Sequence, residues 1–163
     1  MIEEIVYKPI GVIHSPHKEA KGTPIQPTAA EGIAGRVEVY PQYAAGLQDL
    51  AGFSYVILLY HFDQVTVPRL KVKPFLDTEL RGVFATRAPS RPNPIGLSIV
   101  KLVGIQENCL DILGVDVVDG TPLLDLKPYV DRFDTRHSER QGWLETNLGG
   151  LGAKRDDGRF TGA

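Results

Sequence analysis

The chain has 163 residues, of which 42% are hydrophobic, and its 18 Lys and Arg against 20 Asp and Glu leave a net charge of −2. This length suits one globular domain, the apolar fraction excludes a disordered chain, and the apolar run 56–60 is far below the ~20 residues of a membrane span. The N-terminus lacks a secretion signal and Cys109 is the single cysteine, so we expect a cytoplasmic protein without an internal disulfide. The slightly negative net charge argues against a protein that coats nucleic acid indiscriminately.

Short apolar runs rich in β-branched residues, separated by turn residues, predict strands along most of the chain. In chain order these strands are 5–13, 35–40, 54–62, 82–86, 95–105, 109–118 and 123–126. Polar and apolar residues alternate at 36–40 and 110–116, which is typical of a sheet with one wet face. The run 56–60 is apolar throughout, so we expect it to be buried on both faces as the spine of the core.

One short helix is predicted after the strand 35–40. Pro41 suits a first helical position, Tyr43, Leu47 and Leu50 share one face, and Gly52 can end the helix in the left-handed conformation. Because helical patterns do not alternate with the strands, we expect a mainly β fold built as a closed or nearly closed barrel. Residues 148–163 include five glycines and few large apolar groups, which predicts an irregular tail that stays loosely packed unless a partner orders it.

The charges are unevenly distributed along the chain. The blocks 1–63, 64–104, 105–131 and 132–163 carry net charges of −3, +5, −5 and +1. A local basic surface such as 64–104 can bind a polyanion even on a slightly acidic protein. The alternative is that these side chains are solvated loop and strand-edge groups that pair with the acidic block after them.

Three segments carry polar groups in a pattern that a core does not explain. In Lys21-Gly-Thr-Pro-Ile-Gln-Pro27, two prolines hold the backbone extended beside the Gln26 amide. In Thr86-Arg-Ala-Pro-Ser-Arg-Pro-Asn-Pro-Ile-Gly96, three prolines predict a rigid loop that presents arginines to a carboxylate or phosphate. In Asp116-Val-Val-Asp-Gly-Thr-Pro122, a strand ends in carboxylates that can hold a ribose hydroxyl or an ammonium group. Each segment can also be read as a connecting turn.

Several common sites are absent from the sequence. No G-x-G-x-x-G or Walker A motif supports a nucleotide-binding site of those types, and no G-x-S-x-G elbow supports a serine hydrolase. The four histidines lack the i, i+4 spacing of a zinc helix and there is one cysteine, so we expect no metal site.

Four motifs follow one another along the chain: Ile10-Gly-Val-Ile-His-Ser-Pro16, Phe53-Ser-Tyr-Val, Gly82-Val-Phe-Ala-Thr-Arg-Ala-Pro-Ser-Arg-Pro-Asn-Pro-Ile-Gly-Leu97 and Asp119-Gly-Thr-Pro-Leu-Leu-Asp-Leu-Lys-Pro-Tyr129. Together they resemble the TsaA-like domain of the TrmO methyltransferases. The resemblance runs in order over 10–129. It implies a single-sheeted β-barrel domain at 4–137, a C-terminal extension at 138–163, and a homodimer with the cofactor near the subunit interface.

The resemblance also implies an enzyme that uses S-adenosylmethionine to methylate N6 of threonylcarbamoyladenosine next to the anticodon of tRNA. By motif match, the residues implied for the cofactor site are Pro24, Ile25, Gln26, Phe62, Asp63, Arg87, Leu97, Asp116, Asp119, Gly120 and Thr121. Many members of the family have Pro-Arg-Gln where this chain has Pro24-Ile25-Gln26, so one cationic contact is missing here.

An N6 that carries a carbamoyl group has a more acidic N–H than a simple amine, so a modest base suffices for methylation. We take Asp119 or Asp63 as the candidate base, and Arg91 as the charge stabiliser or the clamp for the threonyl carboxylate. For each acid, a structural or ribose-binding role stays open. Two other functions stay open as well: a methyltransferase of a small molecule on the same barrel, and a non-catalytic RNA-binding barrel that uses the basic block.

Overall fold

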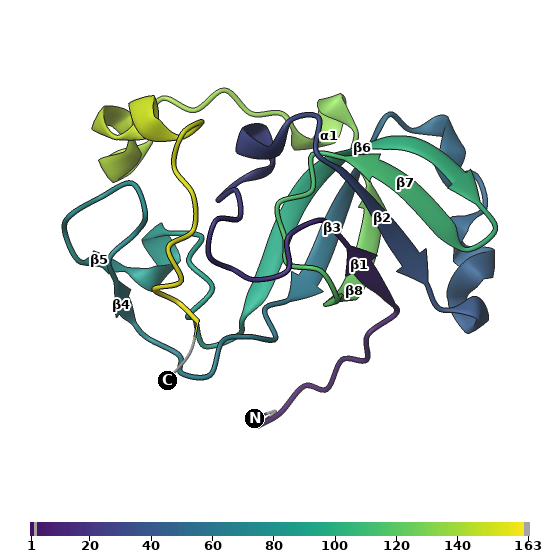
Figure 1. The fold of residues 1–163 in the computed structure, drawn as a ribbon, viewed down its shortest axis with the longest axis horizontal. Coiled ribbons are helices and arrows are strands. Elements are labelled where there is room, and N and C mark those ends of the chain that lie inside the picture. The colour runs from purple at the N-terminus through teal and green to yellow at the C-terminus, as the bar shows by residue number, and fades with distance from the viewer. Residues whose placement is uncertain (2, 162–163) are drawn as a thin grey trace.

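Six antiparallel strands close into a barrel in the computed structural model, which describes residues 1 and 3–161 apart from the side chain of Pro27 (Figure 1). The strands are β1 (Gly11–His14), β2 (Ala34–Val39), β3 (Tyr55–His61), β6 (Ile95–Gln106), β7 (Cys109–Leu113) and β8 (Thr121–Pro128). Their order around the barrel is β1-β2-β7-β6-β3-β8. The prediction of a mainly β, single-sheeted barrel is therefore confirmed.

Alternate side chains of each strand point inward, because successive residues of a strand face opposite sides of the sheet. Val56, Leu58 and Tyr60 of β3 are buried in the barrel, and Val100 of β6 lies beside them. The other face of β3 is only partly buried, so the expectation that 56–60 is covered on both sides is wrong. On that face Tyr55 is exposed and Ile57, Leu59 and His61 are partly buried.

The predicted strands at 35–40, 54–62 and 95–105 are confirmed to within one residue at each end. The predicted strand 5–13 begins only at Gly11; residues 5–9 are exposed, and Ile10 is partly buried against the core. The predicted strand 109–118 ends at Leu113, because Gly114 adopts φ 94° and turns the chain out of the sheet. At 82–86 the chain forms β5 (Arg81–Gly82), paired with β4 (Lys71–Val72), and then the 3₁₀ helix η4 (Val83–Ala85).

The predicted helix after Pro41 is two 3₁₀ helices, η2 (Pro41–Leu47) and η3 (Leu50–Gly52). Asp49, at φ 67°, takes the left-handed conformation that was expected at Gly52, and this separates the two segments. The other short helices are η1 (Pro27–Ala30), α1 (Asp131–Asp134), η5 (Gly142–Thr146) and η6 (Leu148–Gly150). None of the helices in the described part of the chain has the length and apolar character needed to span a bilayer.

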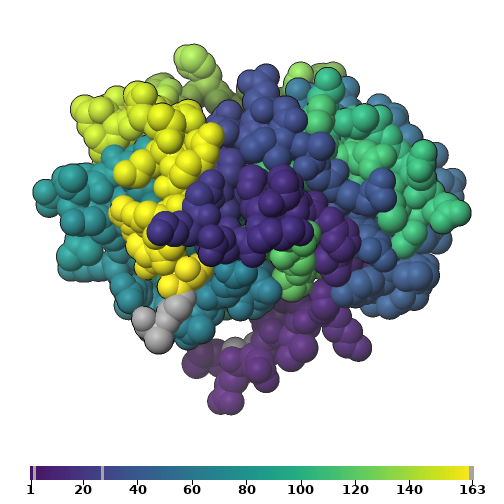
Figure 2. Space-filling model, in the orientation of Figure 1, coloured from purple at the N-terminus to yellow at the C-terminus, as the bar shows by residue number. Residues whose placement is uncertain are grey.

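The C-terminal segment packs on the side of the barrel where β4 and β5 lie (Figures 1 and 2). Phe160 is 7% exposed and joins a second core cluster with Val72, Val83 and Ala88, where its ring meets Phe75 edge-to-face at 5.0 Å. The expectation of a loosely packed tail is therefore wrong for this segment.

Two backbone hydrogen bonds fix the same segment to the loop before η1. The Gly22 N–H donates to the Asp156 carbonyl at 2.6 Å, and the Asp156 N–H donates to the Thr23 carbonyl at 2.8 Å. These hydrogen bonds hold the segment around Asp156 against the loop 21–27, one of the three polar segments identified in the sequence.

Candidate functional site

A pocket of about 900 Å³ lies between the end of the barrel and the second core cluster. Its walls come from five parts of the chain: the loop 20–28, the end of β3 with 62–65, the segment 74–97, residues 116–121 and the C-terminal segment 143–161. All three segments singled out in the sequence therefore contribute to one pocket. Such a volume is at the upper end of the ~300–1,000 Å³ that small-molecule sites occupy.

Two of the proline-containing loops touch at the pocket wall. The Arg87 Nη1 donates to the Gln26 side-chain carbonyl at 3.1 Å, and Pro24 and Ile25 line the wall beside it. Prolines on both loops limit backbone freedom, so the ordering entropy of this wall is lost when the chain folds and not when a ligand binds.

The proline-rich loop is also braced from within. The Arg91 Nη1 donates to the carbonyls of Thr86 and Ala88, at 3.2 and 3.3 Å, while the Arg91 side chain lines the pocket. The Thr86 hydroxyl donates to the Val83 carbonyl at 2.8 Å. Arg91 thus holds the loop with one end of its guanidinium, and this fixes the orientation of the group in the pocket wall.

The inner wall of the pocket is apolar. The rings of Tyr60 and Phe62 meet edge-to-face with centroids 5.3 Å apart, and Leu97 lies on the neighbouring strand. Gly96 makes this packing possible, because a Cβ at that position would lie 2.2 Å from Cε2 of Tyr60 and 2.8 Å from Cζ of Phe62.

A chain of hydrogen bonds links the barrel core to a carboxyl group in the pocket. The Ser98 hydroxyl donates to Asp116 Oδ1 at 2.6 Å, so its proton is committed, and the Tyr60 hydroxyl 2.9 Å away donates to Ser98 Oγ. Burial raises the pKa of Asp116 to about 7, and the Ser98 hydrogen bond and Arg87 limit that rise. Burial also raises the pKa of Tyr60, which keeps its hydroxyl protonated. Near pH 7 the Asp116 carboxyl is therefore poised between its neutral and ionised forms.

The structure brings most of the predicted site residues into this pocket. The pocket-lining members are Pro24, Ile25, Gln26, Phe62, Asp63, Arg87, Arg91, Leu97, Asp116 and Thr121. The Asp63 side chain is exposed to solvent at the pocket edge, whereas Asp116 lies deeper.

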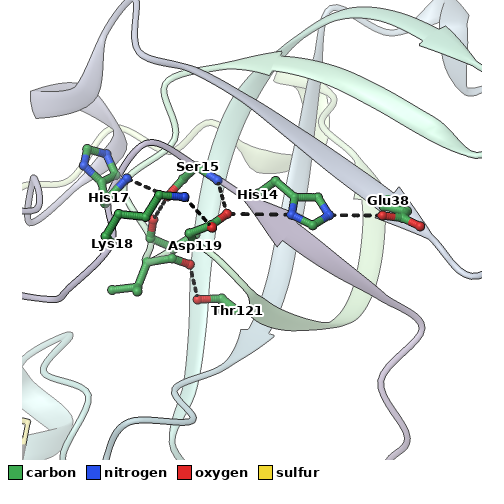
Figure 3. A network of polar contacts seen from close by, with 9 residues as sticks. His14, Ser15, His17, Lys18, Glu38, Asp119 and Thr121 are labelled. Carbon is green, nitrogen blue, oxygen red and sulfur yellow. Dashed lines mark hydrogen bonds and ion pairs between the residues drawn. The ribbon is translucent and has the colours of Figure 1, made fainter.

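Asp119 and Gly120, which were also expected at the cofactor site, are not among the residues that line this pocket. Asp119 accepts hydrogen bonds from the Ser15 N–H at 3.0 Å and from Lys18 Nζ at 2.7 Å, and His14 Nδ1 lies 3.7 Å away (Figure 3). The Lys18 hydrogen bond is the main reason that the pKa of Asp119 lies below its ordinary value. The physical reason for its position is the turn before β8, where Gly120 at φ 84° donates to the Ile13 carbonyl and directs the turn toward β1. Asp119 therefore joins this turn to Ser15 and Lys18.

Sequence reasoning missed the contribution of the C-terminal segment to the pocket. Trp143, Leu144, Leu148 and Phe160 line it, and the Trp143 Nε1 donates to the Ala85 carbonyl at 2.8 Å. The one signal in the sequence was the single tryptophan of the chain, placed within an otherwise Gly-rich region. Among the described residues, no group of three or more His, Cys, Asp or Glu side chains is arranged to hold a metal ion.

Comparison with known proteins agrees with the family suggested by the motifs. The family model described as the tRNA-methyltransferase O N-terminal domain matches residues 12–135. A probable S-adenosyl-L-methionine-binding protein of Pyrococcus abyssi is 56% identical over 96% of this chain and 85% of its own. The human tRNA (adenine(37)-N6)-methyltransferase is 33% identical over 88% of this chain, but the match spans only 34% of the human protein.

The fold is also similar to a solved structure. The crystal structure of TrmO from Pseudomonas aeruginosa superimposes with a TM-score of 0.74 at 38% identity, covering 88% of this chain. This chain spans 63% of that solved chain, so part of the solved protein has no counterpart in the match.

Proposed function

The chain belongs to the family of tRNA-methyltransferase O N-terminal domains, and on this premise we propose that it uses S-adenosylmethionine to methylate N6 of adenine in tRNA. The preferred substrate in this proposal is threonylcarbamoyladenosine next to the anticodon. The observation that carries the proposal is that one pocket gathers ten of the predicted site residues from separate segments of the chain. A cytoplasmic location, where tRNA is abundant, is part of the same proposal.

The residues of the pocket fit S-adenosylmethionine, which supplies a methyl group on a positively charged sulfonium. The carboxyl of Asp116 suits a cationic or hydroxyl-bearing ligand, since a nearby positive charge favours its ionised form. Tyr60, Phe62 and Leu97 provide apolar surface that excludes water from the reacting atoms. The joined Arg87 and Gln26 side chains form a preorganised polar edge beside Pro24 and Ile25.

In the proposed reaction, Asp63 accepts the proton from the acceptor nitrogen. Its side chain lines the pocket and remains open to solvent, so it can release that proton to water. Arg91 clamps the threonyl carboxylate of the substrate, because its guanidinium lines the pocket and is oriented by the carbonyls of Thr86 and Ala88. Positioning of the two reactants supplies the larger part of the rate acceleration.

We also propose that two copies of the chain associate through the uncovered outer face of β3 and β6. Tyr55, Ile95, Leu97 and Ile99 are 43%, 41%, 45% and 37% exposed on that face. Ile95 and Leu97 line the pocket as well, so a partner on this face would lie against the site. A contiguous exposed apolar surface of this kind is typical of protein interfaces. Ile99→Glu should convert a dimer to a monomer in light scattering, and a wild-type chain that is monomeric at all concentrations would contradict the assignment.

The function is tested by calorimetric titration with S-adenosylmethionine and by transfer of a labelled methyl group to threonylcarbamoylated tRNA. Arg87→Ala should lose binding and transfer, because it separates the two loops of the polar edge. Arg36→Ala is the matched control, since it removes the same charge from an exposed pair with Asp111 on the barrel surface. No cofactor binding by the wild type would refute the proposal, and binding without transfer to any tRNA would favour a small-molecule methyltransferase.

A further inference from the structure

One wall of the pocket is not used by the residues assigned to the cofactor or to proton transfer. It is formed by Phe84 on η4 and by Trp143 and Leu144 on η5. Trp143 and Leu144 lie beyond residue 135, where the match to the family model ends. This wall therefore contains residues that the family model does not include.

Trp143 is anchored to the backbone next to Phe84, and both side chains line the pocket. Trp143 donates from Nε1 to the carbonyl of Ala85, the residue that follows Phe84. The Arg81 guanidinium lies 6.0 Å from the centre of the indole ring, within the range of a cation–π contact. Trp143 is thus fixed in place, while Phe84 is 74% exposed.

An exposed phenylalanine at the edge of a pocket is a surface on which a flat ligand can stack. Lys71 on β4 pairs with Gly82 on β5, two residues before Phe84, and Arg87 follows three residues after it. Both cationic side chains are exposed. Proteins hold unpaired bases of RNA by stacking them on aromatic rings, and cationic side chains of the same surface bind the phosphates.

We infer that Phe84 and Trp143 form the subsite that receives an unpaired purine base of the RNA substrate. An enzyme that modifies a base within RNA must take that base out of its stack, and an aromatic wall replaces part of the stacking that is lost. The inference rests on the proposed function for its choice of ligand, since it names the part of the pocket that holds the acceptor base. It also assigns the C-terminal segment a direct role in substrate binding.

Fluorescence provides a test that needs no catalysis, because Trp143 is the only tryptophan in the sequence. The probe is a short single-stranded RNA with one adenosine among uridines, and the comparison RNA of the same length contains uridines alone. We expect the adenosine-containing RNA to quench Trp143 and to bind more tightly. Phe84→Ala should weaken that binding about 5-fold to 100-fold, whereas Phe84→Tyr, which keeps a stacking ring, should stay within about twofold of the wild type.

Phe133→Ala is the matched control, since Phe133 is 71% exposed on α1 and does not line the pocket. Equal effects of the Phe84→Ala and Phe133→Ala substitutions, or no difference between the two RNAs, would overturn the inference. Phe84→Ala should leave the affinity for S-adenosylmethionine unchanged and raise KM for tRNA. If the wild type methylates tRNA and the Phe84→Ala variant does so with an unchanged KM for tRNA, the subsite is refuted and the proposed function stands. If the adenosine-containing RNA selectively quenches Trp143 but the protein does not methylate tRNA, the proposed function is refuted and the subsite stands.

Discussion

Asp116 gives the most quantitative prediction. Its carboxyl lies in the pocket wall, and burial raises its pKa from 3.8 to about 7. Each pH unit of such a difference is worth about 1.36 kcal/mol, so ionising this group in the folded protein costs about 4 kcal/mol relative to the unfolded chain. Because the folded-state pKa is raised, the contribution of Asp116 to the free energy of unfolding is greatest below pH 3.8 and is lost as the pH rises to about 7.

Asp116→Asn removes this cost while its side-chain carbonyl can still accept the Ser98 hydrogen bond. The variant should therefore gain stability relative to the wild type as the pH rises, by about 2 to 3 kcal/mol between pH 5 and pH 8. Urea unfolding of both proteins across this range measures the difference, and other titrating groups cancel because both proteins share them.

Asp63→Asn serves as the control for this series. It makes the same chemical change at a pocket carboxylate that is exposed, so it reports the effect of the substitution itself without burial. A stability difference for Asp116→Asn that does not change between pH 5 and pH 8 would refute the reasoning that burial holds a proton on this group.

Three further changes probe separate parts of the structure. Gly96→Ala should destabilise the fold by about 1 to 3 kcal/mol and weaken cofactor binding, since the new Cβ would lie 2.2 Å from the Tyr60 ring. A urea unfolding curve equal to that of the wild type would contradict this, because it would show that the Tyr60 ring moves aside freely. Phe160→Ala should cost about 3 to 5 kcal/mol, because this side chain is 7% exposed in the second core cluster, and a melting temperature close to that of the wild type would mean that the C-terminal segment does not stabilise the fold. Asp119→Asn should keep methyl transfer within about twofold of the wild type, because its carboxylate pairs with Lys18 outside the pocket, and a loss of activity of tenfold or more would restore it as a catalytic candidate.

The parts of the fold that local sequence patterns determine were predicted well. Strands such as 55–61 and 95–106 follow from short apolar runs that include β-branched residues and are bounded by turn residues. The site loops were predictable because prolines and arginines at 86–94 have no explanation in a core.

The features that depend on distant contacts could not be predicted in the same way. Phe160 is one apolar residue in a Gly-rich tail, and its burial depends on a cluster formed by residues 72–88. Asp119 follows Asp116 by three residues, and only the direction of the turn at Gly120 decides that one carboxyl faces the pocket and the other faces Lys18. Sequence spacing carries no information on that direction.

The central claim is that this pocket brings S-adenosylmethionine and an adenine of tRNA together for methyl transfer. Mass spectrometry of nucleosides from threonylcarbamoylated tRNA, incubated with the protein and S-adenosylmethionine, tests it most directly. Threonylcarbamoyladenosine should gain the mass of one methyl group on N6, and Arg87→Ala should abolish this product while Arg36→Ala should not. An unmethylated nucleoside after incubation with a wild-type protein that binds the cofactor would contradict it.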